Sequence, residues 1–204
     1  ATRPATRGAP TPPRGTPRAE RVQVRVPRLF TVRTMGFSCV VLLAFVRSPA
    51  LQGGVAILIA ACVDQAELAG AALMPSYTHL RRAQPVLVAH FFLSHAAALR
   101  RDAARLAAAA DEADALTLGS GAIAGTSYPI DTTLLARRLG FSRVVLNSMD
   151  ASSDRDFVAS FLYAASLTMV HLSRLAEDVI IFTGEEHGFF ELADSSATGS
   201  SMMP

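Results

Sequence analysis

The stretch Phe157–Thr183 reads FVASFLYAASLTMVHLSRLAEDVIIFT, and it decides the class of fold. It contains no glycine or proline, and its large apolar side chains cover more than one side of a helix. Ser153, followed three residues later by Asp156, can cap the start, and Gly184 can end the helix. A helix this long and this apolar needs several neighbours to bury it, which predicts a multi-helix bundle formed between subunits.

Two more helices are predicted before this stretch. Residues 55–73 follow a helical pattern that Pro75 ends. Residues 86–113 contain neither glycine nor proline, and their apolar side chains recur at helical spacing. One face of this segment, which includes His95, should be buried. The opposite face should be solvated and carry Arg100, Arg101, Asp102 and Arg105.

The remaining segments are short. A loop of small residues is predicted at 117–130, and a helix at 131–139 follows it and ends at Gly140. No stretch after Leu51 alternates between apolar and polar residues as a half-buried strand does. The predicted class is therefore all-α, a bundle of long helices.

Composition divides the chain into residues 1–49 and residues 50–204. Residues 1–28 are rich in arginine and proline and have no apolar period, which predicts disorder. The apolar run at 37–46 is too short to span a membrane. It is similar to a signal-peptide core, and the arginines also fit a transit peptide, but a buried element or a gene-model artefact explains it better. We expect no membrane partner.

Charge is distributed unevenly along the chain. All 19 basic residues are arginine, so no lysine ammonium is available for catalysis. Residues 1–47 carry nine arginines and one acid, while residues 48–204 carry ten arginines and sixteen acids. The acidic body argues against nucleic acid as a partner. Cys39 and Cys62 form neither a disulfide framework nor a metal-binding spacing, which is typical of a reduced, cytoplasmic protein.

Two motifs that suggest ligands have simpler explanations. Gly119, Gly121 and Gly125 follow a predicted helix rather than a strand, and their spacing is not that of a dinucleotide-binding loop. Residues 185–187, Glu-Glu-His, are adjacent at a helix end, where their side chains do not converge on one ion. We therefore expect neither a metal nor a cofactor.

His79 differs from the other histidines of the chain. Histidines within predicted helices are expected to be packed or hydrogen-bonded, and these are His90, His95 and His171. His79 instead lies in a predicted loop between Pro75 and Pro85, which stiffen the backbone on either side. Because an imidazole suits proton transfer near neutral pH, His79 is a candidate acid or base. The alternative is a surface histidine without a function.

Five segments of residues 50–204 resemble argininosuccinate lyases, the family that includes delta-crystallin within the fumarase/aspartase superfamily. The most specific are Tyr-Thr-His-Leu…Arg-Ala-Gln-Pro, within residues 74–85, and Asn-Ser-Met-Asp, within residues 146–158. The others lie at 118–125, 169–178 and 198–204, the last of which opens the superfamily signature Gly-Ser-Ser-x-Met-Pro. The sequence departs from the family's pattern at Ser76, Arg81 and Thr132.

The resemblance implies a reaction, an assembly and a set of site residues. The reaction is the cleavage of argininosuccinate to arginine and fumarate without a cofactor. The assembly is a homotetramer in which each active site combines three subunits. His79 and Ser200 correspond to the acid–base pair, with Ser200 as the base and His79 as the acid or relay, and Thr78 corresponds to a substrate-binding residue. The signature loop comprises Gly199, Ser200, Ser201, Met203 and Pro204.

The family's N-terminal substrate clamp, and the lysine and asparagine that follow its signature, have no counterpart in this sequence. We therefore expect a fragment that is inactive by itself, in which residues 1–49 are dispensable for folding. One alternative is a non-catalytic, crystallin-like structural or oligomerisation protein on the same scaffold. Another is an arginine-rich, membrane-directed protein whose helices only oligomerise.

Overall fold

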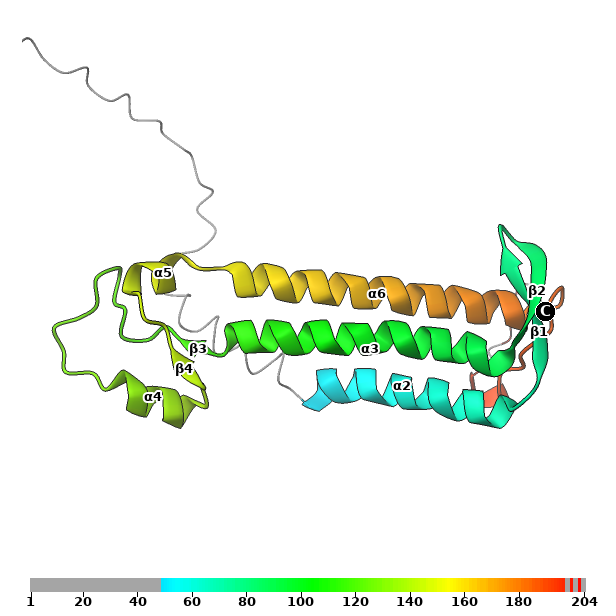
Figure 1. The fold of residues 1–204 in the computed structure, drawn as a ribbon, viewed down its shortest axis with the longest axis horizontal. Helices are drawn as coiled ribbons and strands as arrows, with labels where there is room; N and C mark the ends of the chain where they lie inside the picture. Colours follow the sequence, from blue (N-terminus) through cyan, green and yellow to red (C-terminus); the bar gives the residue numbers. More distant parts are fainter. Residues whose placement is uncertain (1–48, 197–198, 200–201, 203–204) are drawn as a thin grey trace, which may run out of the picture. The chain divides into compact units, whose positions relative to one another are not determined.

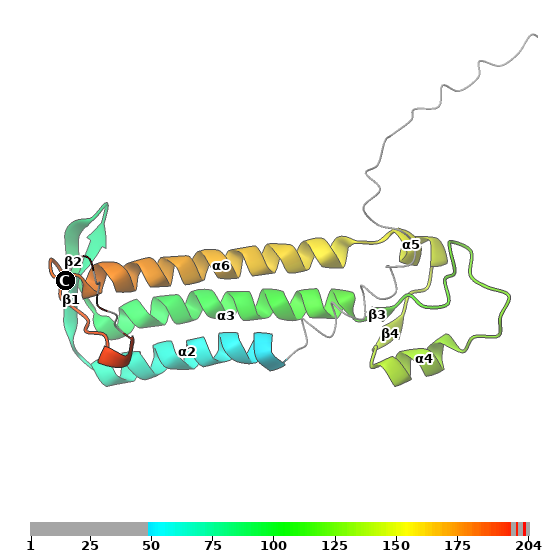
Figure 2. The same cartoon turned by 180° about the vertical axis from the view of Figure 1, so that it is seen from behind.

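The computed structural model describes residues 49–196 together with Gly199 and Met202. Three long helices lie side by side, with α3 between the other two (Figure 1). They are α2 (Pro49–Ala69), α3 (Val88–Ala113) and α6 (Asp156–Thr183). Figure 2 shows the same arrangement from behind. The mostly helical bundle that the sequence predicts is thereby confirmed.

Shorter elements lie at the two ends of these helices (Figure 1). One end carries a hairpin of β1 (Leu73–Thr78) and β2 (Arg81–Leu87), and the 3-10 turn η2 (Asp194–Ser196) follows α6. The other end carries β3 (Ala115–Leu116), α4 (Thr132–Leu139), β4 (Arg143–Val144) and α5 (Ser148–Ser153).

Helix α3 is the central element because both neighbours cover it. Its buried positions recur every three or four residues, as one face of a helix requires, and include His95, Leu99, Asp102, Leu106, Ala109 and Ala113. The prediction that His95 belongs to the buried face is confirmed. The prediction that Asp102 is solvated is wrong, since Asp102 is 0% exposed.

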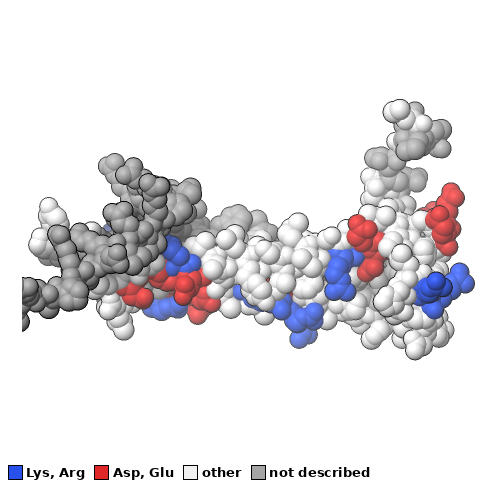
Figure 3. Space-filling model, turned by 90° about the horizontal axis from the view of Figure 1, so that it is seen from above, with Lys and Arg blue, Asp and Glu red and all other residues white. Residues whose placement is uncertain are grey.

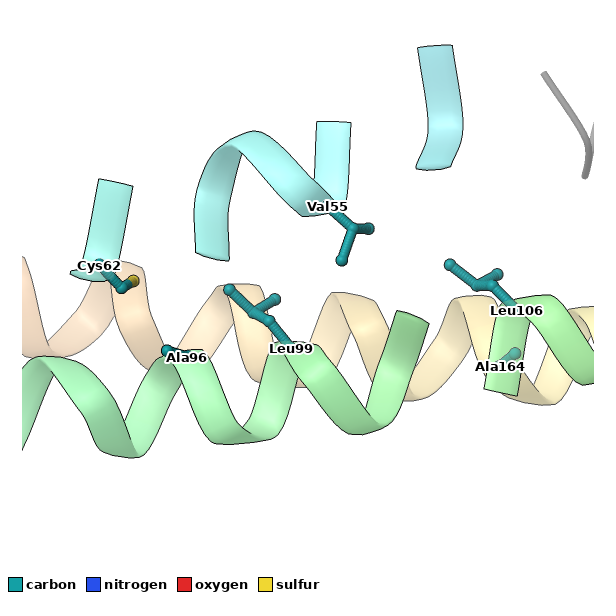
Figure 4. Close-up of a cluster of buried hydrophobic side chains, with 6 residues drawn as sticks. All are labelled: Val55, Cys62, Ala96, Leu99, Leu106 and Ala164. Atoms are coloured by element: carbon teal, nitrogen blue, oxygen red, sulfur yellow. The ribbon is translucent and has the colours of Figure 1, made fainter. Parts of the chain in front are cut away.

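The core of the three-helix bundle combines branched side chains with small ones (Figure 4). Leu99 and Leu106 of α3 pack with Val55 and Cys62 of α2, and Ala164 of α6 closes the same cluster. An alanine has no side chain beyond Cβ, so at this contact the backbone of α6 can approach α3 closely. Burial also raises the pKa of the Cys62 thiol.

A second core lies at the far end of α3. Ala113 and Leu116 pack against Phe141 and against Phe157, at the start of α6. The strands β3 and β4 pair in parallel, and their ends are held by Asp114, whose Oδ1 accepts a hydrogen bond from the Ser142 amide at 2.9 Å. This core fixes where α6 begins relative to the end of α3.

Helix α4 has the ends that the sequence predicts. Asp131 caps its start, with Oδ1 accepting a hydrogen bond from the amide of Leu134 at 2.8 Å. Gly140 ends it in the left-handed region, at φ 79°. The small-residue loop before it is also present, between β3 and α4.

The predicted ends of two helices are wrong. Helix α2 occupies 49–69 rather than 55–73, because Gly70 adopts a left-handed backbone (φ 54°) and ends it early. Ser153 does not cap α6, since it is the last residue of α5, a separate short helix. At the start of α6 the amide of Asp156 donates instead to Asp154 Oδ1, at 2.8 Å.

The segment predicted as a stiff loop is a β-hairpin. Pro75 pairs with Pro85 and Thr78 with Arg81, with an irregularity in register between Pro75 and Tyr77. The sequence pattern does not predict these strands, because prolines interrupt the alternation of apolar and polar residues and lack the amide hydrogen that pairs strands. The hairpin still satisfies part of its backbone through side chains, since Ser76 Oγ donates to the Gln84 carbonyl at 2.6 Å.

Two helices, Leu51–Ala69 within α2 and Asp156–Thr183, are long and apolar enough to cross a membrane by length and composition alone. This is weak evidence, because the core helix of a soluble protein passes the same test. Residues 1–48, Cys39 included, lie outside the described residues. The predicted division of the chain at residue 49 therefore stays a prediction.

Leu99→Ala should destabilise the bundle strongly. Leu99 is 2% exposed within the buried cluster, and its truncation removes apolar contacts and leaves a cavity, so we expect a loss of about 2–5 kcal/mol in the free energy of unfolding. Urea denaturation followed by circular dichroism measures it. Leu93→Ala, on the same helix at 45% exposure, is the control and should cost far less. Equal losses for the two variants would contradict this position of the core.

Candidate functional site

The predicted site residues Thr78 and His79 lie at the tip of the β1–β2 hairpin. Thr78 is the last residue of β1 and pairs with Arg81, so His79 and Leu80 form a two-residue turn. Both residues have positive φ, 52° for His79 and 58° for Leu80. This is the conformation of a type I′ turn, whose twist matches the twist of the flanking strands.

The turn is unusual in its residues. Type I′ turns favour asparagine, aspartate and glycine, because a left-handed backbone costs an ordinary residue about 1–2 kcal/mol. Here a histidine and a leucine adopt it, and Leu80 is 77% exposed, so burial of its side chain does not offset the cost. Backbone strain of this kind occurs preferentially at functional sites. The turn therefore supports a functional role for the histidine.

The imidazole of His79 is exposed and free to reach another molecule. Within the described part of the chain it makes no hydrogen bond, ion pair or ring contact. Thr78 is exposed beside it and brings a hydroxyl, which can donate or accept. Together the two residues provide an acid or base and a hydrogen-bonding group, which is the chemistry that a proton-transfer site needs.

A cluster of rings holds the base of this tip against the end of α6. Tyr77, the residue before Thr78, has its ring centroid 5.8 Å from that of Phe182, 5.1 Å from that of His187 and 6.1 Å from that of Phe189. The three partner rings also contact one another. The backbone amides of Phe189 and Phe190 donate to the Phe182 carbonyl, at 2.9 and 3.1 Å, which ties the segment after α6 to its end.

The predicted signature loop is only partly described. Gly199 is exposed and outside any helix or strand. Ser200, Ser201, Met203 and Pro204 lie outside the described residues, so the predicted pairing of His79 with Ser200 stays a prediction.

Sequence reasoning missed a polar pair inside the bundle. Asp102 of α3 accepts a hydrogen bond from His171 Nδ1 of α6, at 2.6 Å through Oδ2, and one from Arg105 at 3.0 Å through Oδ1. A buried carboxylate needs such partners, because its transfer from water without them is costly. The expectation that His171 is hydrogen-bonded is confirmed. The helical spacing of Asp102 with Leu99 and Leu106 was the available signal.

A second pair, between His95 of α3 and Asp178 of α6, is less well hydrogen-bonded than the first. Asp178 Oδ2 lies 3.2 Å from His95 Nε2, which is ion-pair distance, yet the buried Nε2 makes no aligned hydrogen bond. Burial lowers the pKa of His95, the carboxylate of Asp178 opposes this, and the nearby charge of Arg174 adds to it. The pKa is lowered on balance, so the imidazole is neutral near pH 7.

Recesses of the surface lie at both ends of the helices. One of about 520 Å³ lies at the hairpin end and is lined by residues that include Ala72, Val88 and Phe189. Another of about 340 Å³ is lined by the glycine-rich loop, including Gly119, Gly121 and Ser120, at the end of the helices opposite the hairpin. A Cβ on Gly121 would lie 2.3 Å from the carbonyl oxygen of Gly125, so close backbone packing explains this glycine. Thr78 and His79 do not line this recess. Among the described residues, no three His, Cys, Asp or Glu side chains are placed to hold an ion.

Comparison with known proteins identifies relatives. The sequence profile of a protein family described as Lyase matches residues 39–204, and so begins before residue 50, where composition places the start of the domain. The chain is 59% identical over 144 residues to an argininosuccinate lyase of Roseiflexus sp. (strain RS-1), a match that covers 71% of this chain and 32% of the relative. It is 52% identical over 156 residues to an argininosuccinate lyase of Moorella thermoacetica, covering 76% of this chain and 34% of that protein. The chain thus spans about a third of the length of these relatives.

Solved structures agree on the fold. A structure of EDDS lyase in complex with formate superposes with a TM-score of 0.69 at 26% identity, covering 83% of this chain and 33% of that one. A fumarate lyase:delta crystallin from Brucella melitensis bound to cobalt superposes with a TM-score of 0.71 at 24% identity, covering 84% of this chain and 40% of that one. At 24% identity the second likeness concerns the fold alone.

Leu80→Gly should stabilise the chain. Glycine adopts a positive φ without the steric cost that leucine bears, so we expect a gain of up to about 1 kcal/mol, reduced by the entropy of glycine in the unfolded state. Thermal melting measures the change. Leu87→Gly is the matched control, because Leu87 has φ −69° and the same substitution should destabilise there. A loss of stability in Leu80→Gly would contradict a strained turn.

His95 should make stability depend on pH. Its pKa is lower in the folded chain than in the unfolded chain, so the unfolded chain binds a proton more readily at this site. Stability should therefore fall as the pH is lowered through and below about 6.5, the ordinary pKa of histidine. Urea denaturation at several pH values between about 5 and 7.5 measures the slope. His95→Gln should flatten it more than His90→Gln, which removes an exposed imidazole from the same helix. Equal slopes for the two variants would refute the assignment.

Proposed function

Because this chain belongs to the lyase family, we propose that residues 50–204 form the central part of an argininosuccinate lyase, a carbon–nitrogen lyase of arginine biosynthesis. The observation that carries the proposal is the 59% identity to an argininosuccinate lyase over 144 residues, a stretch that covers 71% of the chain. The exposed histidine on a strained turn agrees with it, because such a residue is placed to act on a substrate rather than to support the core.

The proposed reaction is a β-elimination. A base removes the proton from the carbon next to a carboxylate of argininosuccinate, and the electron pair forms a dianionic aci-carboxylate. The C–N bond to the guanidino nitrogen then breaks, the electron pair of the carbanion becomes the double bond of fumarate, and an acid protonates the departing nitrogen to give arginine. The costly species is the dianion, which needs fixed positive charge and N–H donors.

We assign roles to three residues. Ser200 is the base, His79 is the acid or a relay, and Thr78 hydrogen-bonds the substrate. A serine hydroxyl is a weak base in water, so buried N–H groups and positive charge must favour its alkoxide. The glycine and serines of the signature loop can provide the N–H donors. The chain has no lysine, so any cation that it contributes itself is an arginine or a protonated histidine.

We also propose a homotetramer with shared active sites, located in the cytoplasm. Large apolar side chains of α6 are exposed, including Leu162, Tyr163, Met169 and Ile180, and the face along α6 is largely uncharged in its middle (Figure 3). A membrane is a poorer partner for this helix, because Arg174, Glu177 and Asp178 lie within it. Other copies of the chain would bury the same surface without burying those charges in lipid.

A chimera tests the function directly. Residues 50–204 would replace the matching third of the Roseiflexus sp. relative, and fumarate release from argininosuccinate would be followed by ultraviolet absorbance. We expect turnover within about tenfold of the intact relative, because single contacts contribute factors of that order. His79→Asn and Ser200→Ala should each lower kcat by at least about 100-fold, with KM within about threefold, since both act on protons in the transition state.

Mixing the two inactive chimeras tests the shared site. If His79 and Ser200 of one site come from different subunits, dissociation and reassembly should restore activity at roughly a quarter of the sites. Subunit exchange is verified by native mass spectrometry. Exchange without recovered activity would place the pair in one subunit or refute the assignment. A folded chimera without any turnover would favour the crystallin-like structural protein.

A further inference from the structure

The hairpin tip extends away from the helices and makes few side-chain contacts with them. The residues from Thr78 to Arg82 are exposed, and His79 has no partner among the described residues. The position of the imidazole therefore depends on the backbone of the turn and on whatever fixes the strands below it. A tip two residues long is stiff within itself, since both dihedral angles are restricted. It can still swing as one body about its base.

Tyr77 is placed to oppose such a swing close to the tip. It lies one position before Thr78 and two before His79, and its ring packs among Phe182, His187 and Phe189. Phe182 is buried at the end of α6, so the anchor belongs to the rigid bundle rather than to another loop. Across the hairpin, Tyr77 pairs with Arg82, whose Nε lies 3.4 Å from the tyrosine oxygen.

The hairpin before α3 and the segment after α6 therefore meet at the ring of Tyr77. The hairpin precedes α3, while Phe182, His187 and Phe189 lie at or just after the end of α6. The segment after α6 continues toward Gly199, so the same cluster fixes the start of the path to the signature loop. Any movement of Tyr77 would shift the histidine relative to that path.

We propose that Tyr77 is a positioning residue for His79, acting through its ring and not through its hydroxyl. The expected effect on kcat rests on the proposed function. The expected effect on the position of His79 rests on geometry alone. The ring is the larger contribution because three aromatic partners contact it, whereas the hydroxyl has a single, long hydrogen bond to an exposed arginine.

The first test uses the chain as it stands and needs no activity. Histidines are labelled with ¹³C at Cε1, and His79→Asn identifies the His79 signal among the five histidines. Tyr77→Leu should narrow the His79 signal, because the tip then moves more freely, and speed amide exchange at Arg81, which closes the turn with Thr78, by about tenfold. Tyr77→Phe should leave both unchanged. Tyr128→Leu removes an exposed tyrosine outside the cluster and is the matched control.

A second variant covers the case in which Tyr77→Leu does not fold. Phe189→Leu removes one ring that packs on Tyr77 from outside the hairpin, and it should change the His79 signal in the same direction. An unchanged His79 signal in the folded variant, Tyr77→Leu or else Phe189→Leu, would overturn the proposal. So would a change in the His79 signal of Tyr77→Phe as large as that of Tyr77→Leu.

The second test separates positioning from mere stability. In the chimera, Tyr77→Leu should lower kcat by about tenfold or more with KM within about threefold, and Tyr77→Phe should restore it. An equal loss in Tyr77→Phe, or a change in KM alone, would overturn the role of the ring. If the parent chimera has no turnover, the proposed function fails, while the signal of His79 still decides whether Tyr77 positions it.

Discussion

The packing of α3 between α2 and α6 is the constraint on which the rest of the structure depends. The hairpin leads directly into the first turn of α3, and β3 follows its last turn, so both ends of the unit take their position from this helix. Contact with α6 is close where Ala164 lies beside Leu106 (Figure 4). A larger residue at that point would separate the helices and, with them, the hairpin from the end of α6.

Polar contacts between α3 and α6 add alignment to this packing. The apolar cluster alone tolerates sliding by a turn, since leucines and alanines recur along both helices. The pair of Asp102 and His171 does not, because a one-turn slip would leave a fully buried carboxylate without its imidazole. The contact between His95 and Asp178 lies further along the same helices and agrees with the same alignment. Neither pair belongs to the proposed proton-transfer chemistry.

Much of the fold could be predicted from the sequence, and the failures have physical reasons. The spacing of Leu99, Leu106 and His95 identifies the buried face of α3 correctly, because burial of apolar side chains dominates helix packing. Asp102 was misjudged because a charged side chain is normally expected at the surface. The partner that compensates its charge lies 69 positions away and cannot be found from local spacing. For the site, the prolines around His79 indicated a stiff segment, but they did not indicate that this segment is a hairpin. The turn at His79 and Leu80 could not be foreseen, since neither residue favours a positive φ. Ser200 lies outside the described residues, and its pairing with His79 stays a prediction.

The rung at which Pro75 faces Pro85 has a consequence for how the hairpin meets other molecules. Neither residue has an amide hydrogen, so at this level the hairpin presents no donor on either edge. An exposed two-stranded ribbon would otherwise be a template onto which a further strand could add, which is how aggregates and amyloid begin. Two opposed prolines interrupt that template within both strands. The ribbon can thus protrude into solvent and offer its tip for contact by side chains, while its backbone stays closed to recruitment of additional strands.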